Sequence, residues 1–388
     1  MQIVRHWLVF MVWMLASQLC GQEKSMLEPE ITALTRKLSD AAAAEPLDVE
    51  PLRSTLNELY EKSRVLAAEY QKQCIEQHPQ LADFLKSRRE NESAEFTEAP
   101  VVLFGAVTEE QVLAKWREQL RATARGILGI AEHDRAYYGE FMYWGDYEGE
   151  RKPAYAYVRI EQIRDCCKEL KALVALLTLP RKLTRVEAGA TIFADDFSGD
   201  LKNWTCYGKG EFKVSDKRLH VSGAGLAFWC NQELEDSIVT LDYTPVSAKG
   251  NGAGALFAFP GSPVPGKTYE ISSGPMDQYN VGINTYHCSL YRGNSGKTNL
   301  RRTGPGLKML STVTPDACAE LKQTYRLTFV KYGRSIQVLV DGKLIHAYVD
   351  PGTYGPPLMK GRFGVRHFSA GELECFYANF QARAVKEK

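Results

Sequence analysis

Polar residues at alternate positions mark the stretch 278–286 as a place for ligand chemistry. The polar set is Gln278, Asn280, Asn284 and Tyr286, and the apolar set between them is Tyr279, Val281 and Ile283. Side chains alternate across a β-strand, so the two sets face opposite ways. Amides both donate and accept hydrogen bonds, and an aromatic ring offers a stacking surface, as sugar hydroxyls and sugar rings require. We expect the polar set to line a carbohydrate groove; the alternative is a solvated face.

Charged residues on neighbouring predicted strands could extend this groove. Glu270 falls on the polar side of its own strand by the same alternation. Arg301 and Arg302 suit a uronate carboxylate or a sulfate, although adjacent residues of a strand point oppositely, so at most one of them faces a ligand. Arg366 alternates with apolar neighbours and is expected on a polar face, whereas His367 shares the apolar side and is expected to be structural. A surface salt bridge is the alternative role for the arginines.

The sequence leaves catalysis open. A retaining glycosidase needs two carboxylates about 5 Å apart, and no Glu-x-Asp-x-x-Glu run supplies them on one strand face. The acidic groups 233–236 and 372–374 are expected to face solvent. A polysaccharide lyase would instead need a cation to neutralise the substrate and a base, for which Arg301, Tyr286 and His287 are candidates.

No cofactor is expected, and a calcium ion is the weaker alternative. Asp195 and Asp196 are adjacent acids near the start of the predicted sandwich, where an end-bound calcium would lie. Cysteine and histidine spacings typical of a zinc site do not occur in the chain.

Apolar residues follow two kinds of periodicity along the chain. The two kinds separate predicted helices from the predicted strands that must position these residues. Apolar residues recur with a helical period from about residue 23 to residue 180, which predicts an N-terminal helical domain with a loop at 90–100. The motif Thr108-Glu-Glu-Gln111 is typical of a helix start. The stretch 181–190 is basic and is expected to be a linker. From 190 to 385 the period is two, which predicts a separate β domain.

The predicted strands are short and are separated by glycine, asparagine, aspartate and proline. Asp341-Gly342 is a type I′ hairpin signal between two apolar runs. Many short antiparallel strands at this spacing are typical of a sandwich or jelly roll. The expected strands are 211–214, 218–221, 238–243, 254–259, 267–272, 278–286, 325–331, 335–340, 343–348 and 362–367. We therefore predict an α plus all-β chain whose second domain is a concanavalin A-like β-sandwich.

Three segments carry a resemblance to known proteins. The opening Asp-Asp-Phe-Ser-Gly-Asp-Leu-Lys-Asn-Trp (195–204) and the Val-Asp-Gly-Lys hairpin resemble laminin-G and concanavalin A-like jelly rolls. The segments 298–306 (Thr-Asn-Leu-Arg-Arg-Thr-Gly-Pro-Gly) and 354–367, followed by Tyr-Ala-Asn-Phe at 377–380, resemble the YesU-like family. That family occurs in bacterial polysaccharide-utilisation settings and has no settled activity, and the resemblance covers residues 191–384.

The resemblance adds motif positions but no catalytic residue. The family pattern leads us to expect Lys where Arg302 stands and Phe where Leu307 stands. The first departure keeps a cation, and the second puts an aromatic contact in doubt. Together with the residues above, the expected ligand-binding set is Glu270, Gln278, Asn280, Asn284, Tyr286, Asn299, Arg301 and Arg366.

Composition and the first residues bear on partners and location. Lys plus Arg total 48 and Asp plus Glu total 47, so the net charge of +1 offers no field for nucleic acid. Arg5, the apolar run 7–15 and the small residues after it predict a signal peptide over residues 1–21 and a secreted or periplasmic protein. No integral membrane segment is then expected after cleavage. The eight cysteines beyond Cys20 would permit disulfides in such a compartment.

Carbohydrate is therefore the expected partner. The leading hypothesis is an exported protein that binds or processes polysaccharide or oligosaccharide through a groove of the β-sandwich. A polysaccharide lyase or glycoside hydrolase is the first alternative, and a structural module that contacts another protein is the second.

Overall fold

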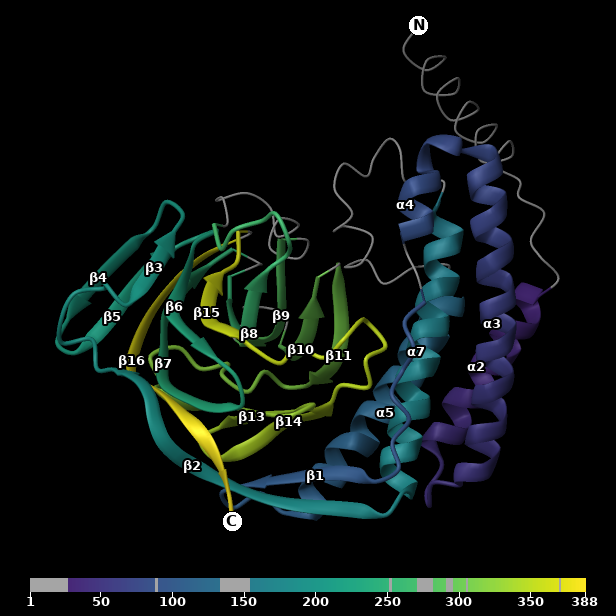
Figure 1. Ribbon diagram of the computed structural model, residues 1–388, viewed down its shortest axis with the longest axis horizontal. Helices are drawn as coiled ribbons and strands as arrows, with labels where there is room; N and C mark the ends of the chain where they lie inside the picture. The colour runs from purple at the N-terminus through teal and green to yellow at the C-terminus, as the bar shows by residue number, and fades with distance from the viewer. Residues whose placement is uncertain are drawn as a thin grey trace, which may run out of the picture.

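The computed structural model shows helices followed by a β-sandwich (Figure 1). It describes residues 27–87, 90–132, 154–250, 253–270, 282–290, 296–304, 306–369 and 371–388. The predicted signal peptide lies outside these residues. Among them, no helix is long and apolar enough to cross a lipid bilayer. The eight cysteines from Cys74 to Cys375 are free thiols.

The helices form where the apolar period of 3.6 predicts them. They are α2 (Leu27–Ala43), α3 (Val49–Gln77), the 3₁₀ turn η1 (Pro79–Leu81), α4 (Ala82–Ser87), α5 (Glu109–Glu132) and α7 (Tyr155–Thr178). The predicted helix start at Thr108 is confirmed, and the structure shows it to be a capping box. The backbone N–H of Gln111 donates to Thr108 Oγ1 over 3.3 Å, and the N–H of Thr108 donates to Gln111 Oε1 over 2.9 Å.

The strands form two sheets. One runs in the order β1-β2-β16-β7-β12-β13-β14, and β5 pairs with β16 and with β4. Its members are β1 (Ala99–Phe104), β2 (Arg181–Asp195), β4 (Glu211–Ser215), β5 (Arg218–Gly223), β7 (Ser237–Lys249), β12 (Tyr325–Tyr332), β13 (Ser335–Val340), β14 (Lys343–Val349) and β16 (Glu372–Glu387).

The second sheet runs in the order β11-β10-β9-β8-β15-β6-β3 and has seven strands. Its members are β3 (Trp204–Tyr207), β6 (Ala227–Leu234), β8 (Ala255–Pro263), β9 (Ile283–Leu290), β10 (Thr298–Thr303), β11 (Leu307–Val313) and β15 (Gly361–His367). An apolar core that includes Phe257, Phe329 and Phe363 fills the space between the two sheets.

The structure confirms one of the strand predictions and changes two others. At the β13–β14 turn, Asp341 and Gly342 have φ of 50° and 76°, so the type I′ hairpin is confirmed. The described residues 267–270 are not a strand, so the expected strand at 267–272 is wrong there. The strand expected over 278–286 begins, in its described part, at Ile283 and continues to Leu290.

The expected linker at 181–190 is wrong, because these residues are the first part of β2. They pair in parallel with β1, a strand that the helical pattern did not predict, in the register Ala99↔Arg181. The same β2 pairs further along with β16, so both of its edges are occupied. The backbone groups of a linker face solvent, whereas here they pair with β1 over 181–186 and with β16 from Val186 onward.

The helices and the sandwich share one apolar core. Leu339 of β13 and Leu344 and Val349 of β14 belong to the same buried cluster as Leu56 and Trp116 of the helices. Figure 1 shows α5 and α7 beside β14 and β11. Independent folding of residues 190–385 therefore stays a prediction, and such a fragment would expose these side chains to water.

Candidate functional site

The outer face of the seven-stranded sheet, which points away from the nine-stranded sheet, carries an unusual set of polar residues. Along β9, Tyr286, Cys288 and Leu290 point into the core between the sheets. The alternate residues Thr285, His287 and Ser289 therefore point outward.

Strand register aligns this outer face into two rows. The first row runs Trp229, Gly364, Ala258, His287 and Arg301 across β6, β15, β8, β9 and β10. The second row runs Ala227, Arg366, Leu256, Ser289 and Asn299 across the same strands. Arg301 joins the rows, since its Nη1 donates to Ser289 Oγ over 2.8 Å.

The polar residues of these rows are covered. The exposed fractions of Arg301, Arg366 and His287 are 3%, 1% and 0%. Arg366 does lie opposite Phe363 and Val365, which are core residues, as the alternation predicts. In this conformation, however, the two arginines contact protein rather than solvent, so their ligand-binding role stays a prediction.

The Trp229 ring lies close against the backbone at one end of the first row. A Cβ added at Gly364 would lie 2.2 Å from Trp229 Cε3, and one added at Gly261 would lie 2.4 Å from Trp229 Cζ3. Real Cβ atoms do not approach a ring this closely. Only glycine at both positions lets the indole rest against the sheet.

The Trp229 indole belongs to an aromatic patch, which we define as Trp229, Tyr207 and Tyr269. With Ala227, Ala258 and Ile283 they form an apolar cluster separate from the two main cores. The rings of Trp229 and Tyr269 are 5.1 Å apart, and the Arg362 guanidinium lies 4.6 Å from the Tyr269 ring centroid. Tyr207, Tyr269 and Arg362 are partly exposed, and the buried Trp229 Nε1 finds no acceptor among the described residues.

Substituting Gly364 by Ala tests the seating of Trp229. We expect a loss of about 1–3 kcal/mol in the free energy of unfolding, because the methyl group forces the indole off the sheet. Gly199→Ala is the matched control, since a Cβ there meets nothing within 4 Å. Urea unfolding followed by tryptophan fluorescence measures both variants. Equal stability of Gly364→Ala and Gly199→Ala would contradict the close contact between Trp229 and Gly364.

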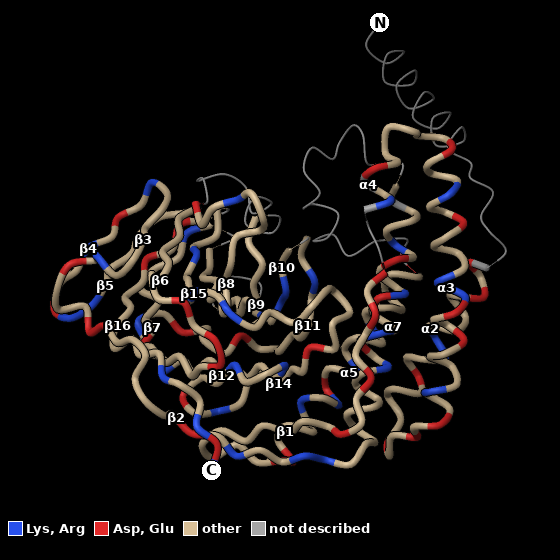
Figure 2. The backbone as a smooth tube through the Cα atoms, viewed as in Figure 1, with Lys and Arg blue, Asp and Glu red and all other residues tan. Residues whose placement is uncertain are grey.

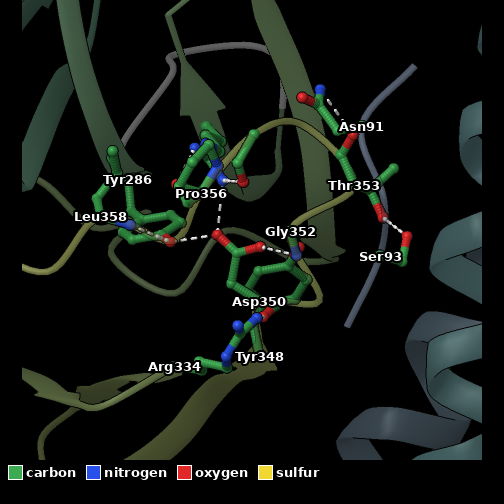
Figure 3. A network of polar contacts seen from close by, with 12 residues as sticks. Asn91, Ser93, Tyr286, Arg334, Tyr348, Asp350, Gly352, Thr353, Pro356 and Leu358 are labelled. Atoms are coloured by element: carbon green, nitrogen blue, oxygen red, sulfur yellow. Dashed lines mark hydrogen bonds and ion pairs between the residues drawn. The ribbon is translucent and has the colours of Figure 1, made fainter. Parts of the chain in front are cut away.

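The expected groove position of Tyr286 is wrong. Its ring lies in the core between the sheets, and its hydroxyl donates to Asp350 Oδ2 and accepts from the backbone N–H of Leu358 at 3.1 Å (Figure 3). Burial raises the pKa of Tyr286 well above its ordinary value. A phenol held in its neutral form cannot serve as the base of a lyase. Tyr286 is therefore also excluded as the base of a polysaccharide lyase.

Arg302 points inward beside Tyr286 and is structural. Its Nη1 donates to Asp350 Oδ2 over 2.7 Å and to the Gly355 carbonyl over 3.0 Å, and its Nη2 donates to the Pro356 carbonyl over 2.6 Å. These bonds join two family-like motifs, 298–306 and 354–367. The cation expected at this position therefore fastens the 350–358 loop to the sheet.

The other residues predicted to bind a ligand lie in different environments. Asn284 shares the inward side with Tyr286, and its Oδ1 lies against Gly304, where a Cβ would approach to 1.9 Å. Asn299 is buried on the outer face, and its Oδ1 accepts from Thr312 Oγ1 over 2.9 Å. Glu270 is exposed to solvent. Gln278 and Asn280 lie outside the described residues.

Two further residues have structural roles. The Nε2 of His367 lies 2.8 Å from the Tyr377 hydroxyl, and burial lowers the pKa of His367 to about 4, so it is a buried neutral histidine as expected. Asp195 uses both oxygens within the protein, accepting from the Phe197 N–H and from Trp204 Nε1. Among the described residues, no three His, Cys, Asp or Glu side chains are grouped to hold a metal ion.

Sequence reasoning missed the aromatic patch. Trp229 lies in the apolar run 227–230, which hides the alternation, and Tyr207 and Tyr269 are distant from it in the chain. The signal that could have found the patch is Gly364 inside a predicted strand, because an interior glycine often marks a close approach.

The fold defines the class of the C-terminal half, which is a β-sandwich of the jelly-roll type. Residues 191–382 match the family model described as "Domain of unknown function (DUF1961)", and this half of the chain belongs to that family. The predicted resemblance to the YesU-like family is confirmed. The chain is 26% identical over 200 residues to "Uncharacterized protein YesU" of Bacillus subtilis (strain 168), which covers 47% of this chain and 89% of that protein.

Solved structures are similar over the same half. A Bacillus subtilis protein of unknown function with a galectin-like fold is 23% identical, with a TM-score of 0.46, over 52% of this chain and all of that one. The carbohydrate-binding module CBM66 of Bacillus subtilis is 14% identical, with a TM-score of 0.34, over 47% of this chain and 96% of that one.

Proposed function

We propose that the protein binds carbohydrate on the outer face of the seven-stranded sheet, at the aromatic patch. The observation that carries the proposal is Trp229, seated on two glycines outside both main cores, with an N–H that finds no acceptor among the described residues. A tryptophan that packs only for stability would normally belong to a core and bond its N–H.

The chemistry of the aromatic patch suits a sugar. Tyr207 and Tyr269 present ring surface that can cover the C–H face of a pyranose, and Arg362 is a donor for its hydroxyl oxygens. Because Arg362 is a cation, a glycan with a uronate or sulfate group gains a charged hydrogen bond there. The described residues supply stacking and hydrogen bonding, so binding is the activity that they support best.

Tyr269→Ala is expected to weaken glycan binding by about 1–3 kcal/mol, since the ring supplies stacking area and holds Arg362 in place. The purified protein would be screened against neutral and acidic polysaccharides by affinity electrophoresis, with product release recorded in parallel. Tyr332→Ala on the other sheet is the matched control, because Tyr332 is also partly exposed. Unchanged binding by the Tyr269 variant would overturn the proposal. Release of shorter saccharides would instead favour the lyase or hydrolase alternative.

Two broader features remain proposals. Export to the periplasm or the cell exterior rests on Arg5 and the apolar run 7–15. A two-domain organisation rests on the change of period near residue 190. Lys and Arg are interspersed with Asp and Glu over helices and sheets (Figure 2), which supports a partner other than nucleic acid.

A further inference from the structure

A cavity of about 510 Å³ lies between the helices and the edge of the seven-stranded sheet. Its helical wall comes from α5 and α7, its other wall comes from β10 and β11, and Tyr354 also lines it. The volume is within the range of roughly 300–1,000 Å³ that small-molecule sites occupy. The α5 and α7 residues lie outside the 191–382 family match, so the DUF1961 domain alone lacks half of this cavity.

Gln119 of α5 supplies a buried acceptor at the cavity wall. It is 4% exposed, and its Nε2 donates to the Leu310 carbonyl of β11 over 2.9 Å, which fixes the orientation of the amide. The remaining Gln119 Oε1 finds no donor among the described residues. A buried acceptor left unbonded destabilises the protein, so a donor from an occupant would remove that penalty.

Ser311, next to Leu310 on β11, supplies the complementary donor. Its Oγ lies 3.0 Å from Nδ1 of His346. Burial lowers the pKa of His346 to about 3, so the ring is neutral and carries one proton, and its Nε2 has no partner among the described residues. Placing the proton on Nδ1 avoids a buried unbonded N–H. His346 then donates to Ser311, and the Ser311 O–H remains to donate into the cavity.

The charged residues that line the cavity are Asp165, Lys297 and Lys308, and Lys297 is exposed to solvent. Asp165 is paired with Arg164 over 2.8 Å, and Lys308 lies 5.3 Å from the Tyr354 ring centroid. Apolar groups such as Met309 and Leu307 line the rest of the wall. A hydroxyl group can both donate to Gln119 and accept from Ser311.

We propose that this cavity is a second binding site, separate from the aromatic patch, for a small neutral polyhydroxylated molecule of the size of a monosaccharide or disaccharide. The bound molecule touches both halves of the chain and links them.

Gly126 offers the test. It lies on α5 at the cavity wall, and a Cβ there meets nothing within 4 Å, so Gly126→Leu fills the cavity without a clash in the helix. Gly129→Leu is the matched control, since Gly129 is on the same helix, is equally open, and is not among the lining residues. Replacing either glycine favours the helix, so both variants should fold.

The full chain would be titrated by calorimetry with a panel of neutral mono- and disaccharides and with glucuronate as the charged probe. We expect a neutral sugar to bind the parent and Gly129→Leu, no detectable binding to Gly126→Leu, and affinity reduced about five- to tenfold in Ser311→Ala. Tyr269→Ala should leave this binding unchanged, which separates it from binding at the aromatic patch. Binding of glucuronate alone, of no neutral sugar, or of a sugar equally by Gly126→Leu would overturn the inference.

Discussion

Arg302→Ala is expected to destabilise the protein by about 3–5 kcal/mol, because it leaves the Asp350 carboxylate buried without its cation. The side chains of Arg302 and Asp350 are 3% and 0% exposed. Asp350 Oδ1 accepts from the Gly352 N–H over 2.7 Å, and Arg334 Nη1 donates to the Asp350 carbonyl over 3.0 Å. The Tyr286 hydroxyl and these bonds would hold the charge in place but would not neutralise it (Figure 3).

Urea unfolding at neutral pH measures this loss. Arg64→Ala is the matched control, since Arg64 pairs with Glu61 at the surface, where both side chains are more than half exposed and the pair is worth about 1 kcal/mol or less. Arg302→Lys keeps the charge and loses the forked contact to the Gly355 and Pro356 carbonyls, so it should fall between the parent and Arg302→Ala. An alanine variant as stable as the surface control would show that the 350–358 loop does not depend on this ion pair.

The contribution of Glu169 on α7 to the free energy of unfolding should fall as pH rises from about 4 to about 8. Burial is the main cause that raises the pKa of Glu169 to about 8, and the nearby Asp350 charge adds to it, whereas bonds with Thr353 and Tyr348 act in the opposite direction. The unfolded chain ionises this group near pH 4.3. Between these two values the folded protein holds a proton that the unfolded chain releases, so unfolding becomes progressively easier, by an amount on the order of several kcal/mol.

Glu169→Gln removes this dependence while keeping a neutral group of the same shape. The stability difference between parent and variant should grow in favour of the variant from pH 5 to pH 8 in denaturant unfolding. The pKa values of His346 and His367 are lowered by burial to about 3 and about 4, so these residues act oppositely below about pH 6.5. They are common to both proteins and cancel in the difference. A difference that stays constant with pH would mean that Glu169 ionises normally in the folded state.

Local features of this fold could be predicted from the sequence. The helix start at Thr108, the turn at Asp341-Gly342 and the change from a period of 3.6 to a period of two each depend on residues within a few positions of one another. The alternation also identified which residues share a side of a strand, since Asn284 and Tyr286 do lie on the same side of β9.

Only the tertiary structure decided which side that was. Both faces of β9 are covered, and Tyr286 can enter a core because its ring is apolar and its hydroxyl bonds to Asp350, a residue 64 positions away. Strand β1 pairs with β2 although α5 and α7 lie between them in the chain, so this pairing had no local signal. The aromatic patch and the cavity each bring together side chains from separate elements, such as Gln119 and Leu310. Periodicity reports only the burial of neighbours along the chain, so contacts between distant segments were fixed by how the sheets and helices pack.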